Sequence, residues 1–316
     1  MLFLDLALLI GLIGSVAAGS LLADDYVDDY VEMPNGMLFH RSCVHVHSST
    51  FSVEDLGDGN ERSASSGKSV VRGRCAYPNK RPVVVPKPTV PTVGYYSDWV
   101  AYAQAIEKDV STPYVFMNSS WFVPPAPKSK GPLGLSSIYL FNGLEDGGGH
   151  HNASLILQPV LSFGKSGCVL DPLHWGQWNL LSFLVSGSGR AHCGPRIGVK
   201  EGEEVVGTME NTGNNTWKVT SMRSLTKETS QYVGQLGPNV HIDAAYVTLE
   251  AMILYTCASF PGGNGTTRFY NNKLLVSRDD QTSVVEPIPW TPIIKHNECH
   301  QNVQIDSDSG DVPLLY

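Results

Sequence analysis

Basic residues are scarce in this sequence and are scattered singly along it. Its 316 residues include 22 Lys and Arg against 30 Asp and Glu, so the net charge is −8, and the isoelectric point is near 5.6. Nucleic acids and anionic membranes attract proteins through basic patches. The composition therefore argues against both, and we expect no nucleic acid and no membrane among the partners of the mature chain.

Long apolar runs are absent after the first eighteen residues, MLFLDLALLIGLIGSVAA. That first run ends in small residues, with Val16 and Ala18 placed as in a signal-peptidase site. It contains Asp5 and has no Lys or Arg ahead of it, so a signal anchor is the alternative. No later stretch approaches the ~18 apolar residues that a membrane span needs. We predict a signal peptide over residues 1–18 and a secreted protein, located outside the cell or in the lumen of the secretory pathway.

No CxxC motif occurs among the six cysteines, which disfavours a zinc site. Their number is even, and an oxidising compartment favours disulfides. Of the fifteen possible connectivities, their order suggests three local pairs, Cys43 with Cys75, Cys168 with Cys193, and Cys257 with Cys299. Sequons predict glycosylated surface loops at Asn118, Asn152, Asn214 and Asn264.

Motifs for metals, cofactors and glycoside hydrolysis are also missing. His45 and His47 could share one face of a strand, but no third ligand is identifiable, so we predict no metal site. Sandwich glucanases carry their two carboxylates in an ExDxxE pattern, which does not occur here. Glu145 and Asp146 adjoin in a Gly-rich stretch, and we interpret them as turn residues of a loop. We expect no cofactor.

Composition divides the rest of the chain into three parts. Residues 19–90 form an acidic and Pro-rich arm with few large apolar side chains, and such a segment buries too little surface to repay its ordering entropy. We expect a pro-segment or a poorly ordered arm, tied to the body by Cys43 and Cys75. Residues 91–300 are predicted to be the folded domain, and residues 301–316 a loose acidic tail.

Most of the folded domain has the pattern of strands separated by Gly-rich and Asn-rich turns. Residues 136–186 contain three apolar runs, IYLF, LILQPVL and WNLLSFLV. Strand alternation places Gln158 on one face with Ile156 and Val160, and Leu157 on the other. The pattern predicts an all-β protein, a two-sheet antiparallel β-sandwich.

One segment departs from the strand pattern. In residues 98–108, DWVAYAQAIEK, the side chains Trp99, Tyr102 and Ile106 recur at helical spacing. We predict one short helix there.

The order of the apolar runs resembles the eqolisins, the glutamic peptidases of fungi. In that family a strand similar to WVGI, a loop and the sequence ILQTG supply a catalytic glutamine, and a later strand similar to ATVEN supplies its partner glutamate. IYLFNGL and ILQPVL stand in the same order here, so Gln158 matches the glutamine, while TWKVTSM stands where ATVEN would be. The resemblance covers about residues 135–260 and implies a concanavalin A-like sandwich.

The sequence departs from the eqolisin pattern at the glutamate. Thr220 occupies its place, and a shift by one residue puts Ser221 there. A hydroxyl group cannot take the proton that a catalytic carboxyl takes from water. Glu210 or Glu250 could substitute if the sheet brought either one close. The catalytic positions that the resemblance implies are therefore Gln158, whose amide would stabilise an oxyanion, and Thr220.

Aromatic side chains around this pattern predict a binding cleft for an apolar or planar small molecule. The predicted lining residues are Trp178, Trp217, Tyr139, Phe141 and Tyr246, with Lys218 as a donor at the rim. The layout of the chain also resembles, more loosely, the secreted fungal hetero-Diels-Alderases. Such cyclisations need a shaped apolar pocket and a hydrogen-bond donor rather than an acid–base pair.

These observations lead to one hypothesis and two alternatives. We hypothesise a secreted protein that binds an apolar small molecule, with cofactor-free cyclisation of a secondary metabolite as its activity. An acid-active glutamic endopeptidase is the first alternative, and a non-catalytic extracellular binding protein is the second. A homodimer is a further expectation.

Overall fold

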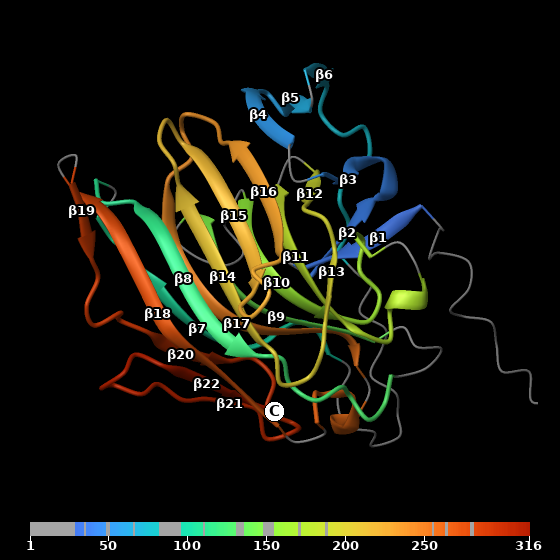
Figure 1. Cartoon of the computed structure of the whole chain (residues 1–316), viewed down its shortest axis with the longest axis vertical. Helices are drawn as coiled ribbons and strands as arrows, with labels where there is room; N and C mark the ends of the chain where they lie inside the picture. Colours follow the sequence, from blue (N-terminus) through green and yellow to red (C-terminus); the bar gives the residue numbers. More distant parts are fainter. Residues whose placement is uncertain are drawn as a thin grey trace, which may run out of the picture.

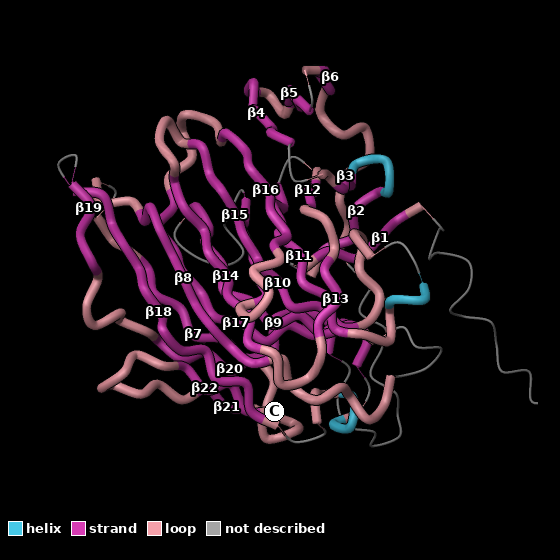
Figure 2. Tube along the Cα trace, in the orientation of Figure 1, coloured by secondary structure: helices cyan, strands magenta, loops and turns pink. Residues whose placement is uncertain are grey.

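The computed structural model describes residues 29–34, 36–48, 51–65, 67–81, 96–109, 111–130, 136–147, 155–169, 172–186, 189–254, 256–262, 265–278 and 281–316. Strands dominate this part of the chain (Figure 2). Its helices are short 3-10 turns, η1 (Arg41–Cys43), η3 (Pro172–His174) and η4 (Cys257–Ser259). None of them has the length and apolar character that crossing a bilayer requires.

The strands run from the N-terminal segment to the C-terminus. In chain order they are β1 (Tyr30–Met33), β2 (Met37–His40), β3 (Val44–Val46), β4 (Phe51–Gly57), β5 (Asn60–Ser65), β6 (Lys68–Arg72), β7 (Tyr96–Ile106), β8 (Tyr114–Phe122), β9 (Ser137–Asp146), β10 (Leu155–Phe163), β11 (Trp178–Ser186), β12 (Ala191–Cys193), β13 (Ile197–Val199), β14 (Glu204–Asn211), β15 (Thr216–Arg223), β16 (Thr229–Gln235), β17 (Ile242–Leu254), β18 (Thr266–Arg278), β19 (Gln281–Val284), β20 (Thr291–Ile294), β21 (Asn302–Val303) and β22 (Val312–Leu315).

Two large sheets form the body in the described part of the chain (Figure 1). The nine-stranded sheet has the order β20-β7-β17-β9-β10-β11-β12-β3, with β13 also paired to β11. The eleven-stranded sheet has the order β21-β22-β18-β8-β14-β15-β16-β4-β5-β6, with β19 also paired to β18. Neighbours are antiparallel except where the N-terminal segment joins each sheet, because β3 pairs with β12 and β4 pairs with β16 in parallel.

The two sheets pack face to face around an apolar core. Trp121 and Trp217 of the eleven-stranded sheet share one buried cluster with Leu157 and Val247 of the nine-stranded sheet. A second buried cluster lies on the opposite face of the nine-stranded sheet and includes Ile156. This arrangement confirms the predicted all-β, two-sheet sandwich.

The nine-stranded sheet is covered on both faces at its centre. Every residue of β9 and β10 is buried, and so is every residue of β11 except Ser186. In contrast, β15 alternates between half-buried and buried side chains from Thr216 to Ser221, as expected for a strand with one face toward solvent. We call the face of the nine-stranded sheet that is turned away from the sandwich core the outer face.

The predicted helix over residues 98–108 is wrong, because these residues belong to β7. The strand pairs with β17 on one side and with β20 on the other. Its register with β17 shifts between Leu249 and Glu250, so that Val100 is an extra residue at a β-bulge. The bulge brings Trp99 and Tyr102 to the outer face although they are three residues apart. A β-bulge can therefore place residues i and i+3 of a strand on the same face, which is the spacing expected of a helix.

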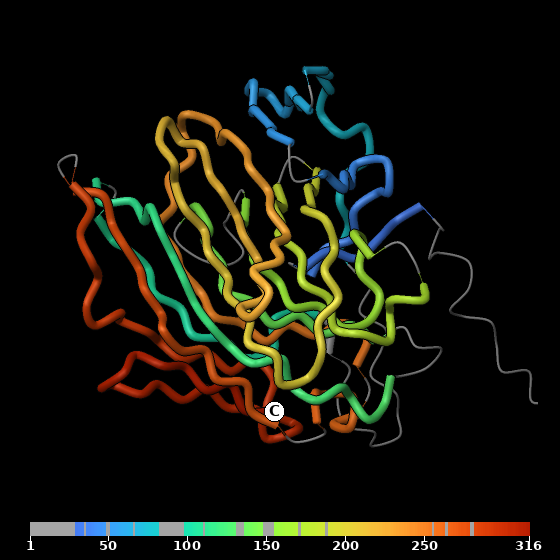
Figure 3. Tube along the Cα trace, viewed as in Figure 1, coloured from blue at the N-terminus to red at the C-terminus, as the bar shows by residue number. Residues whose placement is uncertain are grey.

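The predicted disorder of the N-terminal arm is also wrong for its described residues. The hairpin of β1 and β2 packs on the outer face, where Val31, Met33 and Phe39 are buried. Strands β4, β5 and β6 form a ribbon that extends the eleven-stranded sheet (Figure 3). Cys43 and Cys75 pair with each other, so their disulfide closes a loop within the arm rather than tying the arm to the body.

The acidic C-terminal tail is not loose. Strand β22 pairs with β18, and Val312 and Leu314 are fully buried in the core between the sheets. Arg268 binds Asp311 through its Nε at 2.7 Å, which neutralises one acidic side chain of the tail. Two apolar residues at alternate positions therefore outweigh the acidic composition of this segment.

Candidate functional site

The outer face of the nine-stranded sheet carries Gln158 at its centre. Ile156 and Val160 belong to the apolar cluster on this face, and Leu157 belongs to the core cluster on the other. Because side chains alternate along a strand, Gln158 faces outward with Ile156 and Val160, as predicted. The sequence therefore placed this amide on the correct surface.

Gln158 is fully buried, and neither its Nε2 nor its Oε1 has a hydrogen-bond partner in the described part of the chain. A buried polar group without a partner costs about 1–3 kcal/mol. Buried amides are therefore hydrogen-bonded with few exceptions, and each exception points to strain, to water or to a functional role. Gln158 is the strongest candidate for a functional residue on this face.

Glu145 is the carboxyl group on the strand next to Gln158. The register pairs Ile156 with Glu145 and Leu157 with Leu144, so Gly143 lies opposite Gln158. Glu145 is thus the diagonal neighbour of Gln158, at ~7–8 Å, which is within reach of long side chains. Glu145 and Asp146 lie at the end of β9 and are 3% and 8% exposed, so their interpretation as residues of a loop is wrong.

The charge of Glu145 acts on another side chain of the outer face. Burial, together with the charges of Asp98 and Glu145, raises the pKa of Tyr102 to about 12. Tyr102 lies two strands from β9, opposite Thr248 of β17. Glu145 therefore contributes negative potential to the same buried surface that carries the Gln158 amide.

Three of the predicted aromatic residues, Tyr139, Phe141 and Tyr246, are buried on this face with Gln158. Tyr246 pairs with Gly143, so it lies in the same cross-strand row as Gln158. Trp99 packs edge-on against Phe141 and Tyr246, with ring centroids 5.6 and 4.9 Å apart. The amide thus lies among apolar and aromatic side chains.

The other predicted site residues lie elsewhere. Trp178 and Trp217 are buried in the core between the sheets, where Trp178 packs against Phe163 and Trp217 donates to Asn215 Oδ1 at 3.0 Å. Lys218 alternates with the buried Trp217 and Val219, so it faces away from that core. The predicted cleft, which would combine Gln158, Thr220, Trp178 and Trp217, does not form.

Thr220 and Ser221 do not replace a catalytic carboxyl beside Gln158. Thr220 faces away from the core, and its hydroxyl accepts a hydrogen bond from Gln231 Nε2 at 3.4 Å. Ser221 faces the core and donates to the carbonyl oxygen of Leu181 at 2.7 Å. The structure therefore separates Thr220 from Gln158 by the thickness of the sandwich.

The two glutamates that could have substituted are also remote. Glu250 shares the outer face with Gln158, but it lies opposite Tyr139, two strands and four residues away, or ~16 Å by strand geometry. Its Oε1 accepts a hydrogen bond from Gly36 in the turn between β1 and β2 at 2.8 Å. Glu210 is exposed on the eleven-stranded sheet.

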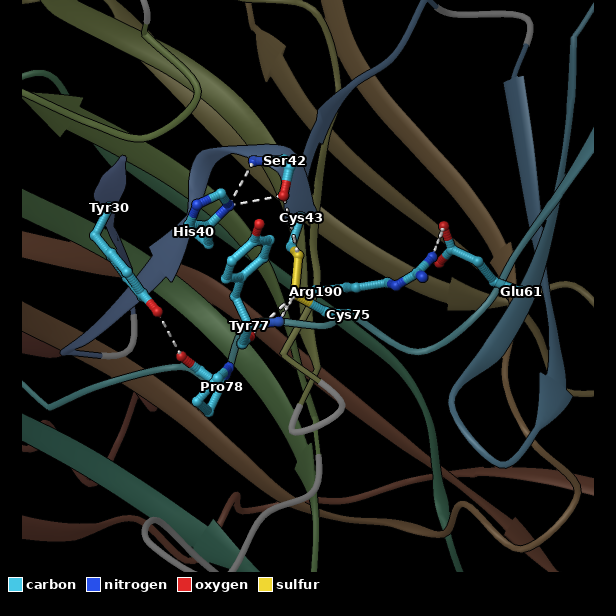
Figure 4. The surroundings of a disulfide bond; sticks show 9 residues. All are labelled: Tyr30, His40, Ser42, Cys43, Glu61, Cys75, Tyr77, Pro78 and Arg190. Atoms are coloured by element: carbon cyan, nitrogen blue, oxygen red, sulfur yellow. Dashed lines mark hydrogen bonds and ion pairs between the residues drawn. A yellow bond between two sulfur atoms is a disulfide. The ribbon is translucent and has the colours of Figure 1, made fainter. Parts of the chain in front are cut away.

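A second polar cluster joins the N-terminal ribbon to the body. His47 Nε2 lies 2.9 Å from His192 Nδ1, and His192 Nε2 lies 2.9 Å from Glu61 Oε2. Arg190 Nη1 lies 2.5 Å from Glu61 Oε1 (Figure 4). No group of three or more metal-ligating side chains is found among the described residues, so the predicted lack of a metal site stays a prediction.

The electrostatics of this cluster follow from burial and pairing. Burial lowers the pKa of His47 to about 2, and the neighbouring His192 adds to this effect. Burial alone would raise the pKa of Glu61, but the hydrogen bond from His192 and the charges of His192 and Arg190 lower it to about 2. Glu61 is therefore a carboxylate over the whole physiological range.

The three disulfides pair as predicted, Cys43 with Cys75, Cys168 with Cys193, and Cys257 with Cys299. Two sequons fall on described residues. Asn214 lies in an exposed turn, whereas Asn118 lies within β8 rather than in a loop, and its Oδ1 accepts from Thr208 at 3.0 Å. Asn152 and Asn264 lie outside the described residues.

Sequence reasoning missed Glu145, Glu61 and His192 as members of polar sites. A signal for Glu145 was present, because the alternation of Tyr139, Phe141 and Gly143 continues to it. No local signal connects Glu61 with Arg190 or His192, since the contact joins segments that are remote in the sequence.

No protein-family model matches the sequence, and no curated protein matches it. Among solved structures, the chain is similar to scytalido-glutamic peptidase with a transition-state analogue inhibitor (TM-score 0.46, 14% identity, 71% of this chain and 100% of that chain). It is also similar to SCP-B, a member of the eqolisin family, in a complex with the tripeptide Ala-Ile-His (0.44, 13%, 71% and 100%) and to aspergilloglutamic peptidase from Aspergillus niger (0.38, 16%, 57% and 98%). Similarity of this degree assigns neither an activity nor a family to the chain, although the solved structures that it resembles do include eqolisins, the family that the sequence resembles.

Proposed function

We propose that the chain is a secreted hydrolase that cleaves amide bonds with the carboxyl group of Glu145 and the amide of Gln158. The observation that carries this proposal is the fully buried Gln158 amide, without a hydrogen-bond partner among the described residues, on the face that also carries Glu145. A carboxyl group and an amide are the pair that the eqolisin resemblance implies. Here the carboxyl group comes from β9 instead of β15.

In this reaction Glu145 transfers the proton and Gln158 stabilises the oxyanion. The Glu145 carboxylate takes a proton from water while the water oxygen bonds to the carbonyl carbon of the substrate. The Gln158 amide donates a hydrogen bond to the oxyanion that forms. The protonated Glu145 then gives its proton to the leaving nitrogen as the C–N bond breaks and the carbonyl group forms again.

Access to this pair requires movement of the chain that covers it, because Gln158 and Glu145 are 0% and 3% exposed. The hairpin of β1 and β2 covers one end of the outer face, where its turn binds Glu250. Secretion is supported by the apolar run of the first eighteen residues and by the three disulfides, which persist in oxidising compartments.

The test is cleavage of denatured casein by the purified full chain between pH 2 and 7. We expect Glu145→Gln to lower the rate at least ~100-fold, as for loss of a general base, and Gln158→Ala to lower it by a similar factor. Glu201→Gln, in an exposed turn, is the matched control and keeps the wild-type rate. Absence of cleavage by the wild type, or full activity of Glu145→Gln, would refute the proposal.

One observation favours a second candidate, the binding and cofactor-free cyclisation of an apolar small molecule. The neighbours of Gln158 along β10 and across β11 are Ile156, Val160 and Phe183, so its amide is a hydrogen-bond donor in apolar surroundings. This chemistry needs no carboxyl group.

The same variants separate the two candidates. A binder of apolar molecules takes up the fluorophore 8-anilinonaphthalene-1-sulfonate with quenching of tryptophan fluorescence, and Gln158→Ala weakens this binding whereas Glu145→Gln leaves it unchanged. Neither cleavage nor fluorophore binding is expected of a non-catalytic extracellular binding protein.

A further inference from the structure

A pocket lies at the junction between the N-terminal ribbon and the body, and we call it the seam pocket. Its walls come from β4, β5 and the turn between them, from the ends of β10 and β11, from the residues around β12, and from β16. Leu155 and Leu184 line it from the core side of the nine-stranded sheet, whereas Gln158 faces the outer side. The seam pocket is therefore separate from the site around Gln158.

Buried charged side chains form one wall of the seam pocket. Arg190 is 5% exposed and Glu61 is 6% exposed, and both line the pocket. The guanidinium contacts Glu61 through Nη1, as Figure 4 shows, but Arg190 Nε has no hydrogen-bond partner in the described part of the chain. A buried donor without a partner is costly, and a guest that brings an acceptor to Arg190 Nε would remove that cost.

The rim of the pocket carries two carboxylates and an amide. Asp55, Asp58 and Asn60 line it from the ribbon, and all three are exposed. An anionic guest would be repelled by the two rim carboxylates and by Glu61. An ammonium group has no lone pair, so it could not accept a hydrogen bond from Arg190 Nε. A hydroxyl group both donates and accepts, so it satisfies the rim carboxylates and the Arg190 donor together.

The size and the floor of the pocket narrow the ligand class further. Its volume is about 130 Å³. A single water needs about 10–15 Å³ by the same measure, so the pocket has room for several waters or for one sugar ring. Leu155, Leu184 and Leu236 supply an apolar floor for the C–H groups of a ring.

We propose that the seam pocket binds a neutral polyol of the size of one sugar ring, held by Arg190, Asp58 and Asn60. The proposal is independent of the hydrolase chemistry, because it uses a different face of the sheet and none of the residues assigned to that reaction. It gives the N-terminal ribbon a part in ligand binding, since the rim residues belong to the ribbon.

The experiment is saturation-transfer NMR of the full chain with glucose, galactose, mannose and xylose, followed by titration of whichever binds. We expect saturable binding of at least one of these sugars. Arg190→Lys keeps the charge that faces Glu61 but removes the Nε donor, and it should raise the dissociation constant at least tenfold. Asp58→Asn and Asn60→Ala change exposed residues and should raise it as well, while Glu201→Gln should not.

Folding of each variant is checked by its thermal midpoint. If Arg190→Lys does not fold, Asp58→Asn and Asn60→Ala decide the question. Acetate and propylammonium, both smaller than a sugar ring, serve as the anionic and the cationic probe. The proposal is overturned if none of the four sugars binds, if acetate or propylammonium binds in preference to them, or if binding is the same in the wild type and in the folded pocket variants.

Discussion

His192 Nε2 lies 2.9 Å from Glu61 Oε2, and this contact joins the N-terminal ribbon to β12, the strand that ends at the disulfide-bonded Cys193. Arg190 contacts the other oxygen of the same carboxylate. The side chains of Glu61, Arg190 and His192 are 7%, 6% and 2% exposed, so the pairing takes place away from water. One carboxylate thus compensates a guanidinium and orients an imidazole.

Removal of this carboxylate should destabilise the protein strongly. Glu61→Ala leaves Arg190 buried without its counter-charge, and breaking a buried pair in this way costs about 3–5 kcal/mol. Glu54→Ala is the matched control on the same ribbon, because the pair of Glu54 with Arg62 is about half exposed and should contribute less than about 1 kcal/mol. Urea titrations followed by tryptophan fluorescence measure both. Equal losses in the two variants would contradict the role of the buried pair.

Glu32 should make the protein less stable as the pH rises. Burial raises the pKa of Glu32 to about 8, against the opposing effects of Lys165 and Ser137. The folded chain then binds one proton more than the unfolded chain between about pH 4.5 and 8. The contribution of Glu32 to the free energy of unfolding is fully present below about pH 4.5. It falls by up to about 1.4 kcal/mol per pH unit as the pH rises toward 8.

Glu32→Gln tests this dependence, because the amide has the same shape and does not ionise. Urea midpoints of the wild type and the variant are measured at pH 5 and pH 8. The wild type should lose stability between these values, and the variant should lose much less of it. A control at the exposed Glu201, also changed to Gln, should follow the wild type. Parallel pH profiles for Glu32→Gln and the wild type would show that Glu32 is not protonated in the folded state.

The Cys43–Cys75 disulfide should stabilise the ribbon more than the sheets. It closes the segment that contains β4, β5 and β6, and a loop of this length contributes about 3–4 kcal/mol through the unfolded state. In the double variant Cys43→Ser with Cys75→Ser, hydrogen exchange should accelerate in the ribbon before it does in β8 and β14. The double variant Cys257→Ser with Cys299→Ser should leave the ribbon protected. Uniform acceleration over all strands would contradict this expectation.

Gly207→Ala should disrupt the contact between the sheets behind Gln158. A Cβ at Gly207 would overlap Asn142 Oδ1 and would lie 2.8 Å from Pro159 Cβ, across the interface between β14 and β10. Asn142 Nδ2 also donates to the carbonyl oxygen of Gly207 at 3.1 Å. Overpacking of this kind costs about 1–3 kcal/mol.

The control for Gly207→Ala is Gly198→Ala, since a Cβ there would meet only Arg196 Nη1, at 3.5 Å. Thermal midpoints of the two variants provide the comparison. A midpoint for Gly207→Ala equal to that of Gly198→Ala would show that the sheets can separate at this point without cost.

Local sequence patterns predicted the strands well and failed at two kinds of position. Alternation identified β9, β10 and β11 and the orientation of Gln158, because the period of a strand is a property of the strand alone. The helix predicted from Trp99 and Tyr102 failed because the bulge at Val100 depends on the register with β17, which no local pattern shows. The prediction of a loose tail failed because two apolar residues, Val312 and Leu314, are too few to indicate a strand when its partner β18 is not known.

The candidate site was predictable only in part for the same reason. Gln158, Tyr139, Phe141 and Tyr246 share the outer face, and their alternation in the sequence is consistent with that. Thr220 could be matched to a catalytic position by motif order, but the fold places it on the far side of the sandwich. Motif order does not specify which sheet a strand joins.

By itself the sequence determined an all-β chain, three disulfides between cysteines that are neighbours in order, and the face of its strand on which Gln158 lies. These properties depend on side-chain alternation and on short separations along the chain. Only the tertiary structure decided that Glu145 is the carboxyl group diagonal to Gln158 and that Glu61 pairs with Arg190 and His192. Such contacts depend on strand register and sheet order, which arise from the packing of the whole chain rather than from any one segment of it.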